Sequence, residues 1–285
     1  MLKDDGSYYT DLEADYIVRE HDQIVPKSFL TYKLDDLARI LRDTRVSLGI
    51  SKIWSPRQMG VLYKRGALVE SEPEEGIGYD LIFNRRLWGD IVLRMDFYYY
   101  DFDNYVVWAH SETDYAQEGD WSQRPRNLDN VEKKGVEVNL SGTIWRAFSF
   151  NVGYVYQDWD YDGPYPSAIE ELSDRAKHRV NAGLRYRIFK NTLFMVDYSY
   201  QSEQTAYINE EDPPLSGDFI AYENDMDSFN VFDMAIEQIL IRKSTYFHDL
   251  KLKVYSKNVF DEEYEDERGY PMTDVTFGCS ISCSF

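Results

Sequence analysis

Residue types that commonly perform chemistry are few in this sequence, and their spacing forms no known catalytic or metal-binding motif. Cys279 and Cys283 are four positions apart in an alternating segment, so in a strand their Cα atoms would lie about 13 Å apart, too far for a disulfide. Ser173 and His178 form only a loose hydrolase-like pair, and G-x-S-x-G, C-x-x-C and phosphate-binding glycine loops are absent. The histidines are scattered without a second ligand at metal spacing: His21, His110, His178 and His248. We therefore expect no enzyme, no metal site and no cofactor.

Large aromatic residues are better candidates for a functional role, because exposed aromatic side chains often contribute to ligand binding. Trp108, Trp121, Trp159, Tyr161 and Tyr165 fall in segments that we expect to be long external loops, where a large ring has no core to fill. We therefore predict these five as ligand-binding residues. Interfacial anchoring or packing between loops would explain the same residues, and the sequence leaves both explanations open.

The elements that would position these residues are β-strands with one apolar and one polar face. In the last segment, Phe277 and Ile281 share one face with the terminal Phe285, and small polar residues alternate with them. The same period recurs along the chain, and no run approaches the ~18 consecutive apolar residues of a transmembrane helix. The pattern predicts about twelve strands, at residues 7–18, 26–34, 44–54, 76–84, 90–101, 134–141, 147–157, 178–188, 192–201, 229–240, 248–257 and 274–285.

The connections between the predicted strands alternate between long and short. The long ones are residues 55–75, 102–133, 158–177, 202–228 and 258–273, and the short ones are 85–89, 142–146, 189–191 and 241–247, with 35–43 intermediate. Outer-membrane barrels have long extracellular loops and short periplasmic turns. The expected fold class is therefore all-β: a transmembrane antiparallel meander β-barrel, with apolar residues toward lipid and polar residues toward a wet lumen.

Aromatic residues fall at both ends of the predicted strands, as expected for the two girdles of a membrane barrel. At the short turns they are Trp88, Trp145, Phe189, Tyr246 and Phe247. At the opposite strand ends they are Tyr99, Tyr100, Tyr156, Trp159, Tyr198, Tyr200, Phe229 and Phe260. The general preference of aromatic residues for strands is the alternative explanation.

The formal net charge of −20 is concentrated in the long predicted loops, whereas several basic residues point from strands toward the lumen. These basic residues are Arg94, Arg185, Arg187, Lys251, Lys253 and Lys257. An acidic mouth would repel nucleic acid, so we expect no nucleic-acid partner, and it could gather cations such as Ca²⁺. Solvation of the loops explains the same charge without any bound ion.

Six segments, in order along the chain, resemble passages of TonB-dependent outer-membrane receptors. They are residues 25–56, 72–81, 95–105, 134–138, 178–184 and 257–264. The last of them, KNVFDEEY, is the closest match, and it leads through Gly269, Tyr270 and Pro271 to the terminal aromatic strand. Each segment is short, but their order extends over most of the chain.

The resemblance implies a receptor in the outer membrane of a Gram-negative bacterium that imports a scarce nutrient, such as a ferric siderophore, with energy relayed by TonB. Receptors of this family have 22 strands around a plug. Residues 1–285 are expected to form one barrel domain, about the C-terminal half of that barrel, without plug, TonB box or signal peptide. A self-closed passive pore or surface-binding barrel is the alternative. A split receptor and a truncated gene product also stay open.

The same resemblance implies the partners. Phe277, Ile281 and Phe285 resemble the terminal signal that the barrel-assembly machinery recognises. The apolar face would contact outer-membrane lipid and lipopolysaccharide. A second polypeptide could carry the plug and the remaining strands, and TonB would act only through that plug. The sequence does not identify the nutrient ligand.

Overall fold

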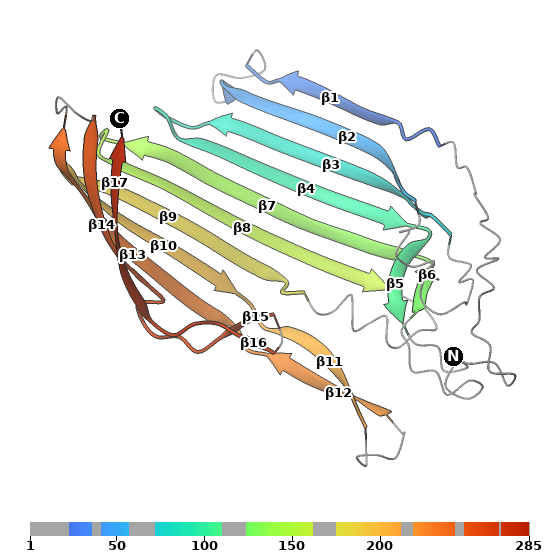
Figure 1. Ribbon diagram of the computed structural model, residues 1–285. Coiled ribbons are helices and arrows are strands. Elements are labelled where there is room, and N and C mark those ends of the chain that lie inside the picture. Colours follow the sequence, from blue (N-terminus) through green and yellow to red (C-terminus); the bar gives the residue numbers. More distant parts are fainter. Residues whose placement is uncertain are drawn as a thin grey trace, which may run out of the picture.

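The computed structural model describes residues 23–35, 41–56, 72–109, 124–161, 175–211, 219–242, 248–267 and 269–284. Most of them form one antiparallel sheet of eleven strands, in the order β1-β2-β3-β4-β7-β8-β9-β10-β13-β14-β17 (Figure 1). Its strands are β1 (Lys27–Lys33), β2 (Thr44–Ser55), β3 (Glu74–Arg86), β4 (Val92–Phe102), β7 (Val131–Ile144), β8 (Phe148–Tyr161), β9 (His178–Phe189), β10 (Thr192–Gln201), β13 (Phe229–Arg242), β14 (Asp249–Lys257) and β17 (Thr276–Ser284). These residues include no helix with the length and hydropathy needed to cross a membrane.

Eleven of the predicted strands correspond to the strands of this sheet, and the predicted strand 7–18 lies outside the described residues. The short turns lie together along one end of the sheet, at the upper left of Figure 1, and the long connections lie at the opposite end. At the long-connection end, several strands extend further than predicted, notably β3, β7 and β8. There β8 continues to Tyr161, because it stays paired with β7 as far as Val131.

Three regions that the sequence predicted as loops contain two-stranded hairpins, so that part of the prediction was wrong. In these hairpins β5 (Tyr105–Ala109) pairs with β6 (Arg124–Leu128), β11 (Gln204–Glu211) with β12 (Phe219–Met226), and β15 (Glu265–Glu267) with β16 (Tyr270–Pro271). Antiparallel pairing hydrogen-bonds the backbone groups that an irregular loop would leave to solvent. The connections therefore continue the strand pairing beyond the sheet itself.

The strand register assembles the apolar residues of neighbouring strands on one face, here called the outer face. Leu81 pairs with Phe97, Phe97 with Val136 and Val136 with Tyr156. Rows of the same kind continue to the last strand, where Leu252 pairs with Ile281. No other layer covers these residues: Leu81 is 40% exposed and Ile281 is 70% exposed. An uncovered, continuous apolar face is what a membrane strand presents to lipid.

The opposite face, here called the inner face, is polar and contains glycines directly across from aromatic rings. Tyr100 of β4 pairs with Gly78 of β3, and a Cβ at Gly78 would lie 2.7 Å from that ring. Tyr255 is opposite Gly278 in the same way. Because glycine has no side chain, the ring on the next strand lies flat over it. The aromatic side chains of the inner face therefore lie flat along the sheet.

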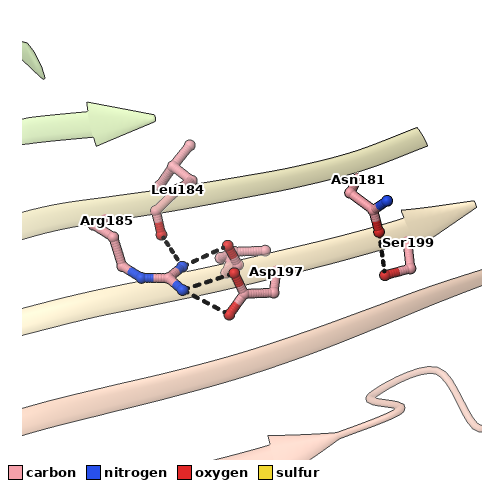
Figure 2. A network of polar contacts seen from close by, with 6 residues as sticks. Asn181, Leu184, Arg185, Asp197 and Ser199 are labelled. Atoms are coloured by element: carbon pink, nitrogen blue, oxygen red, sulfur yellow. Dashed lines mark hydrogen bonds and ion pairs between the residues drawn. The ribbon is translucent and has the colours of Figure 1, made fainter. Parts of the chain in front are cut away.

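Charged residues on the inner face are paired along the wall (Figure 2). Arg185 of β9 donates to both carboxylate oxygens of Asp197 in β10, at 2.7 and 2.9 Å, and also to the backbone carbonyl oxygen of Leu184. Nearby, Ser199 donates to the amide oxygen of Asn181 at 3.3 Å. The inward orientation predicted for Arg185 is confirmed. A charge-assisted hydrogen bond between neighbouring strands supports their register.

The sheet is open among the described residues, with β1 and β17 as its two edges. Because neighbouring strands alternate in direction, the first and last of the eleven strands run the same way. A fully antiparallel barrel therefore needs an odd number of further strands between these edges. Unpaired N–H and C=O groups in hydrocarbon cost several kcal/mol each, so the wall must continue beyond β1 and β17.

Val152 and Asn151 are neighbours in β8 that belong to opposite faces, and they form a matched pair for testing this assignment. Val152→Arg should lower the free energy of unfolding by about 2–4 kcal/mol, because it places a charge in lipid near the bilayer midplane. Asn151→Arg should cost far less, because it points into water. Urea unfolding of the protein in lipid vesicles measures both. Equal costs at the two positions would contradict the assignment of the faces.

Gly135 and Gly153 test whether glycine is needed where an aromatic ring lies across the wall. A Cβ at Gly135 would overlap the Tyr98 hydroxyl and the Tyr156 carbonyl oxygen, whereas the nearest atom to a Cβ at Gly153 is the Asn139 amide oxygen at 3.2 Å. Gly135→Ala should therefore destabilise the barrel by about 1–3 kcal/mol. Gly153→Ala should change the free energy of unfolding by only a few tenths of the change caused by Gly135→Ala. Two equally stable variants would show that the Tyr98 ring moves freely.

Candidate ligand-binding site

The candidate site lies on the inner face at the long-connection end of the sheet. There β4 and β8 end and β7, between them, begins. Tyr98, Tyr100 and Phe102 occupy alternate positions of β4 and share the inner face. Lys133 of β7 lies opposite Tyr100 on one side and opposite Trp159 of β8 on the other. The strand register therefore brings five side chains together from three strands.

The aromatic rings of the site form a continuous chain. Tyr98 and Tyr100 are stacked with their centroids 5.3 Å apart, and Phe102 contacts Tyr105 edge-on at 5.2 Å. Tyr105 in turn lies 5.7 Å from Trp159. Distances of this size fall in the range of favourable aromatic pairs. The site is thus an aromatic surface that spans three strands of the wall.

Two cations lie on this aromatic surface. The Lys133 Nζ atom is 4.8 Å from the Trp159 ring centroid and 5.5 Å from that of Tyr98, and the Arg175 guanidinium carbon is 4.4 Å from the Trp159 centroid. These distances are typical of cation–π interactions. The Trp159 Nε1 donor is buried and has no hydrogen-bond partner among the described residues. The site therefore offers positive charge held in place by rings, together with one unused donor.

A small apolar cluster supports the site from the side of the long connections. Its buried members are Phe102, Val107, Leu128 and Val131, and Ile53, Tyr100, Tyr105, Trp159 and Tyr161 pack against it. The hairpin β5–β6 is also attached through Asn127, whose side-chain amide accepts from the backbone N–H of Glu72 at 2.6 Å and donates to its carbonyl oxygen at 3.0 Å. These contacts hold the start of β5, and hence Tyr105, against the wall.

The ion-pair network formed by Asp158 lies on the outer face, away from the two cations of the site. Asp158 accepts from Lys177 at 2.9 Å and lies 3.6 Å from Lys134. The hydrogen bond to Asp158 raises the pKa of Lys177 above its usual value. Because Asp158 and Trp159 are adjacent in a strand, they point to opposite faces. The carboxylate therefore does not neutralise Lys133 or Arg175.

Two of the five aromatic residues predicted to bind ligand lie in this cluster. Trp159 and Tyr161 belong to β8 and pack on the inner face, so their placement in an external loop was wrong. Trp108 belongs to β5, where only the backbone is described. Trp121 and Tyr165 lie outside the described residues. The sequence did not single out Tyr98, Lys133 or Arg175, although the alternation of aromatic residues at 98, 100 and 102 on a polar face could have indicated a site.

The aromatic residues predicted to form a girdle at the long-connection end of the strands also divide between the two faces. Tyr99, Tyr156, Tyr198 and Tyr200 fall on the outer face, as predicted, whereas Tyr100, Trp159 and Phe229 fall on the inner face. A shift of one residue moves a strand side chain to the other face, so nearness to the strand end does not determine its exposure to lipid. On the outer face of β17, Phe277 is 80% exposed and Ile281 is 70% exposed, and Phe285 lies outside the described residues.

A second hollow, of about 580 Å³, lies between the end of β12 and the β15–β16 hairpin. Its lining includes a tilted ring pair, Phe229 and Tyr264, with centroids 4.4 Å apart. Burial raises the pKa of Tyr264 above its usual value. Five carboxylates also line it: Asp225, Asp227, Glu263, Glu265 and Asp274. Among the residues that the structure describes, no group of three or more His, Cys, Asp or Glu side chains is arranged to hold a metal ion. This acidic hollow does not suit a negatively charged ligand.

The uncovered apolar face, the polar inner face and the separation of short turns from long connections define the wall of an outer-membrane β-barrel. Residues 3–255 match the family described as TonB dependent receptor-like, beta-barrel. The chain belongs to this family, and its location is the outer membrane of a Gram-negative bacterium. The short turns are therefore periplasmic and the long connections extracellular. The family consists of receptors and transporters, not enzymes.

Solved structures with a similar fold include three transporters or receptors. The ferripyoverdine receptor of Pseudomonas aeruginosa, bound to ferripyoverdine, has a TM-score of 0.72 and 15% identity, covering 94% of this chain and 34% of its own. The copper transporter OprC has a TM-score of 0.67 and 16% identity, with 92% and 39% covered. The ferric-catecholate import receptor Fiu of Escherichia coli K12 has a TM-score of 0.63 and 15% identity, with 90% and 34% covered.

At this level of identity the likeness shows the fold alone. The chain spans about a third of the length of the ferripyoverdine receptor and of Fiu. No curated protein sequence matches it. The ligand must therefore be argued from the chemistry of the site.

Proposed function

We propose that the chain forms part of the barrel of a receptor that imports a scarce nutrient, and that this nutrient is a negatively charged ferric siderophore. The observation that carries the proposal is the pair of cations, Lys133 and Arg175, on the aromatic surface at the extracellular end of the inner wall. A ligand entering from outside would meet this surface before the rest of the lumen. The two residues would attract an anion, and the rings would contact its apolar parts.

The charge of the site favours an anionic ligand over a cationic one. The faces of Tyr98 and Trp159 already interact with the protein's own cations, so they are not free for a cationic ligand. The arginine fork and the lysine ammonium both donate to oxygen anions. A ferric catecholate combines negative charge with aromatic rings and therefore matches the site. Two receptors of similar fold, one bound to ferripyoverdine and one that imports ferric catecholates, agree with this class of ligand.

The remaining parts of the proposal concern the whole receptor. Residues 1–285 would form part of one barrel domain, and other parts of the receptor would supply the remaining wall and the plug through which TonB acts. Phe277, Ile281 and Phe285 would serve as the assembly signal, because Phe277 and Ile281 lie on the outer face of β17 and Phe285 continues the same alternation in the sequence. Trp108, Trp121 and Tyr165 stay candidates for contacts with the ligand from the extracellular side.

Lys133→Gln should weaken binding of a ferric catecholate roughly tenfold, or about 1.4 kcal/mol, because it removes a half-buried charge from the site. Trp159→Ala should weaken it as well. Lys257→Gln is the matched control, because it removes an exposed charge from the inner face at the same end of the wall but away from the aromatic surface. Titration of the folded protein by fluorescence quenching gives all three dissociation constants.

The same titration with a ferric hydroxamate of neutral or positive charge separates charge selection from general affinity. Lys133→Gln should leave that affinity unchanged. If Lys133→Gln and Trp159→Ala both bind the catecholate as the unmodified protein does, recognition lies in another part of the receptor and the proposed site is wrong.

Energy-coupled import is tested separately from ligand binding. A receptor closed by a plug should show no steady conductance in a planar bilayer, and cells should take up the ferric ligand only when TonB is present. The protein should be extracted in its folded form for the conductance measurement. A steady ionic current together with TonB-independent uptake would instead establish a passive pore.

A further inference from the structure

The strand β17 contains little information in its own sequence about its position along β14. Serine occupies its inner face at positions 280, 282 and 284, and cysteine or isoleucine occupies its outer face at positions 279, 281 and 283. A displacement of β17 by two residues would keep this alternation and the same hydrogen-bond pattern. Among the described residues, β14 is the only strand that pairs with β17 (Figure 1). Other contacts must therefore define the register of β17.

A glycine on the inner face distinguishes the observed register from its neighbours. Gly278 lies opposite Tyr255 of β14, and a Cβ at Gly278 would overlap the Tyr255 ring. A displacement by two residues in either direction would place Thr276 or Ser280 opposite this ring instead. Both residues have a Cβ, so the ring would have to move. The contact disfavours both displaced registers.

The segment KNVFDEEY connects the end of β14 to the start of β17 through the buried side chain of Asn258. Asn258 directly follows β14 and is 4% exposed. Its backbone N–H donates to a carboxylate oxygen of Asp233 in β13 at 2.9 Å. Its side-chain amide donates to the carbonyl oxygens of Glu262 at 2.8 Å and Thr273 at 3.3 Å, and accepts from the N–H of Glu262 at 2.9 Å. Asn258 therefore joins two distant parts of the connection.

Asp261 makes the contact that lies closest to β17. Its carboxylate accepts from the backbone N–H of Val275 at 2.8 Å, and Val275 is the residue directly before β17. Asn258 has a φ of 49° and Asp261 a φ of 56°, so both are left-handed. Asparagine and aspartate adopt this conformation more readily than other residues with a side chain. The two residues are thus suited to the backbone as well as to the hydrogen bonds.

We propose that Asn258 and Asp261 form a register clamp, which sets the pairing of β17 with β14. The clamp fixes where the chain enters β17, and the contact between Gly278 and Tyr255 acts in the same direction from within the strand. A strand that pairs with the free edge of β17 takes its own register from it. The clamp therefore also determines how the wall is aligned beyond β17. This role is independent of the ligand site on β4, β7 and β8.

The native Cys279 of β17 can report the register directly. Val254→Cys places a second thiol opposite Cys279, whereas Leu252→Cys and Ser256→Cys place it opposite only after a displacement by two residues. Directly opposite residues can form a disulfide, and diagonal neighbours, about 7–8 Å apart, cannot. Each change is combined with Cys283→Ser, which leaves Cys279 as the only native thiol. Folded protein from outer membranes is oxidised, and peptide mass spectrometry locates the disulfide.

With an intact clamp, Cys279 should form a disulfide at position 254 alone. Asn258→Asp removes the two donated hydrogen bonds but keeps the acceptor, because a carboxylate only accepts. Disulfides at position 252 or 256 should then appear at the expense of the one at position 254. Asp261→Ala should have the same effect through the lost contact with Val275, and it tests the proposal even if Asn258→Asp does not fold.

Asp261→Asn is the matched control, because its side-chain oxygen still accepts from Val275 and asparagine tolerates the left-handed backbone. It should keep the disulfide at position 254 alone. A disulfide at position 254 alone in Asn258→Asp and Asp261→Ala, a displaced disulfide in the control, or disulfides at all three positions with an intact clamp would each overturn the proposal.

Discussion

The hydrogen-bond requirement of a backbone in hydrocarbon governs this structure. Lipid offers no donor or acceptor, so each strand must satisfy its N–H and C=O groups through its two neighbours. Eleven strands do so in one antiparallel sheet, with a register shift next to Leu193 and another next to Ile239. The ladder fixes the register, and the register fixes which side chains share a face. Within the described residues, the outer edges of β1 and β17 have no neighbouring strand to meet this requirement.

The ladder also explains how the candidate site is built without a buried core of the usual kind. Tyr100, Lys133 and Trp159 come from three neighbouring strands and meet because they occupy one inner row at the same height. Glycines across from the rings let them lie along the wall, so the site has a flat aromatic floor with cations above it. The apolar cluster around Val107 and Leu128 then holds the first hairpin beyond the sheet against that floor.

The two ends of the wall differ in chemistry because they meet different surroundings. The extracellular end carries hairpins and carboxylates, including the acidic hollow beside Tyr264, and therefore faces water. The periplasmic end consists of tight turns in which Trp145 and Arg146 adopt left-handed conformations. Because these turns are short, few other parts of the protein can contact their side chains. The side chains therefore face the surroundings of the protein.

The sequence by itself determined the eleven strands of the main sheet and the alternation of their two faces, because the alternation of side chains along a strand is a local property with a period of two. It also determined the side of each connection. It also pointed to Trp159 and Tyr161, though as loop residues. Only the tertiary structure decided that β8 extends to Tyr161, that Tyr100 and Trp159 face inward, and that Lys133 and Arg175 lie on their rings. These features depend on how far neighbouring strands remain paired and on which residues are partners in the strand register. The register is a property of two paired strands, so it cannot be read from the sequence of one strand.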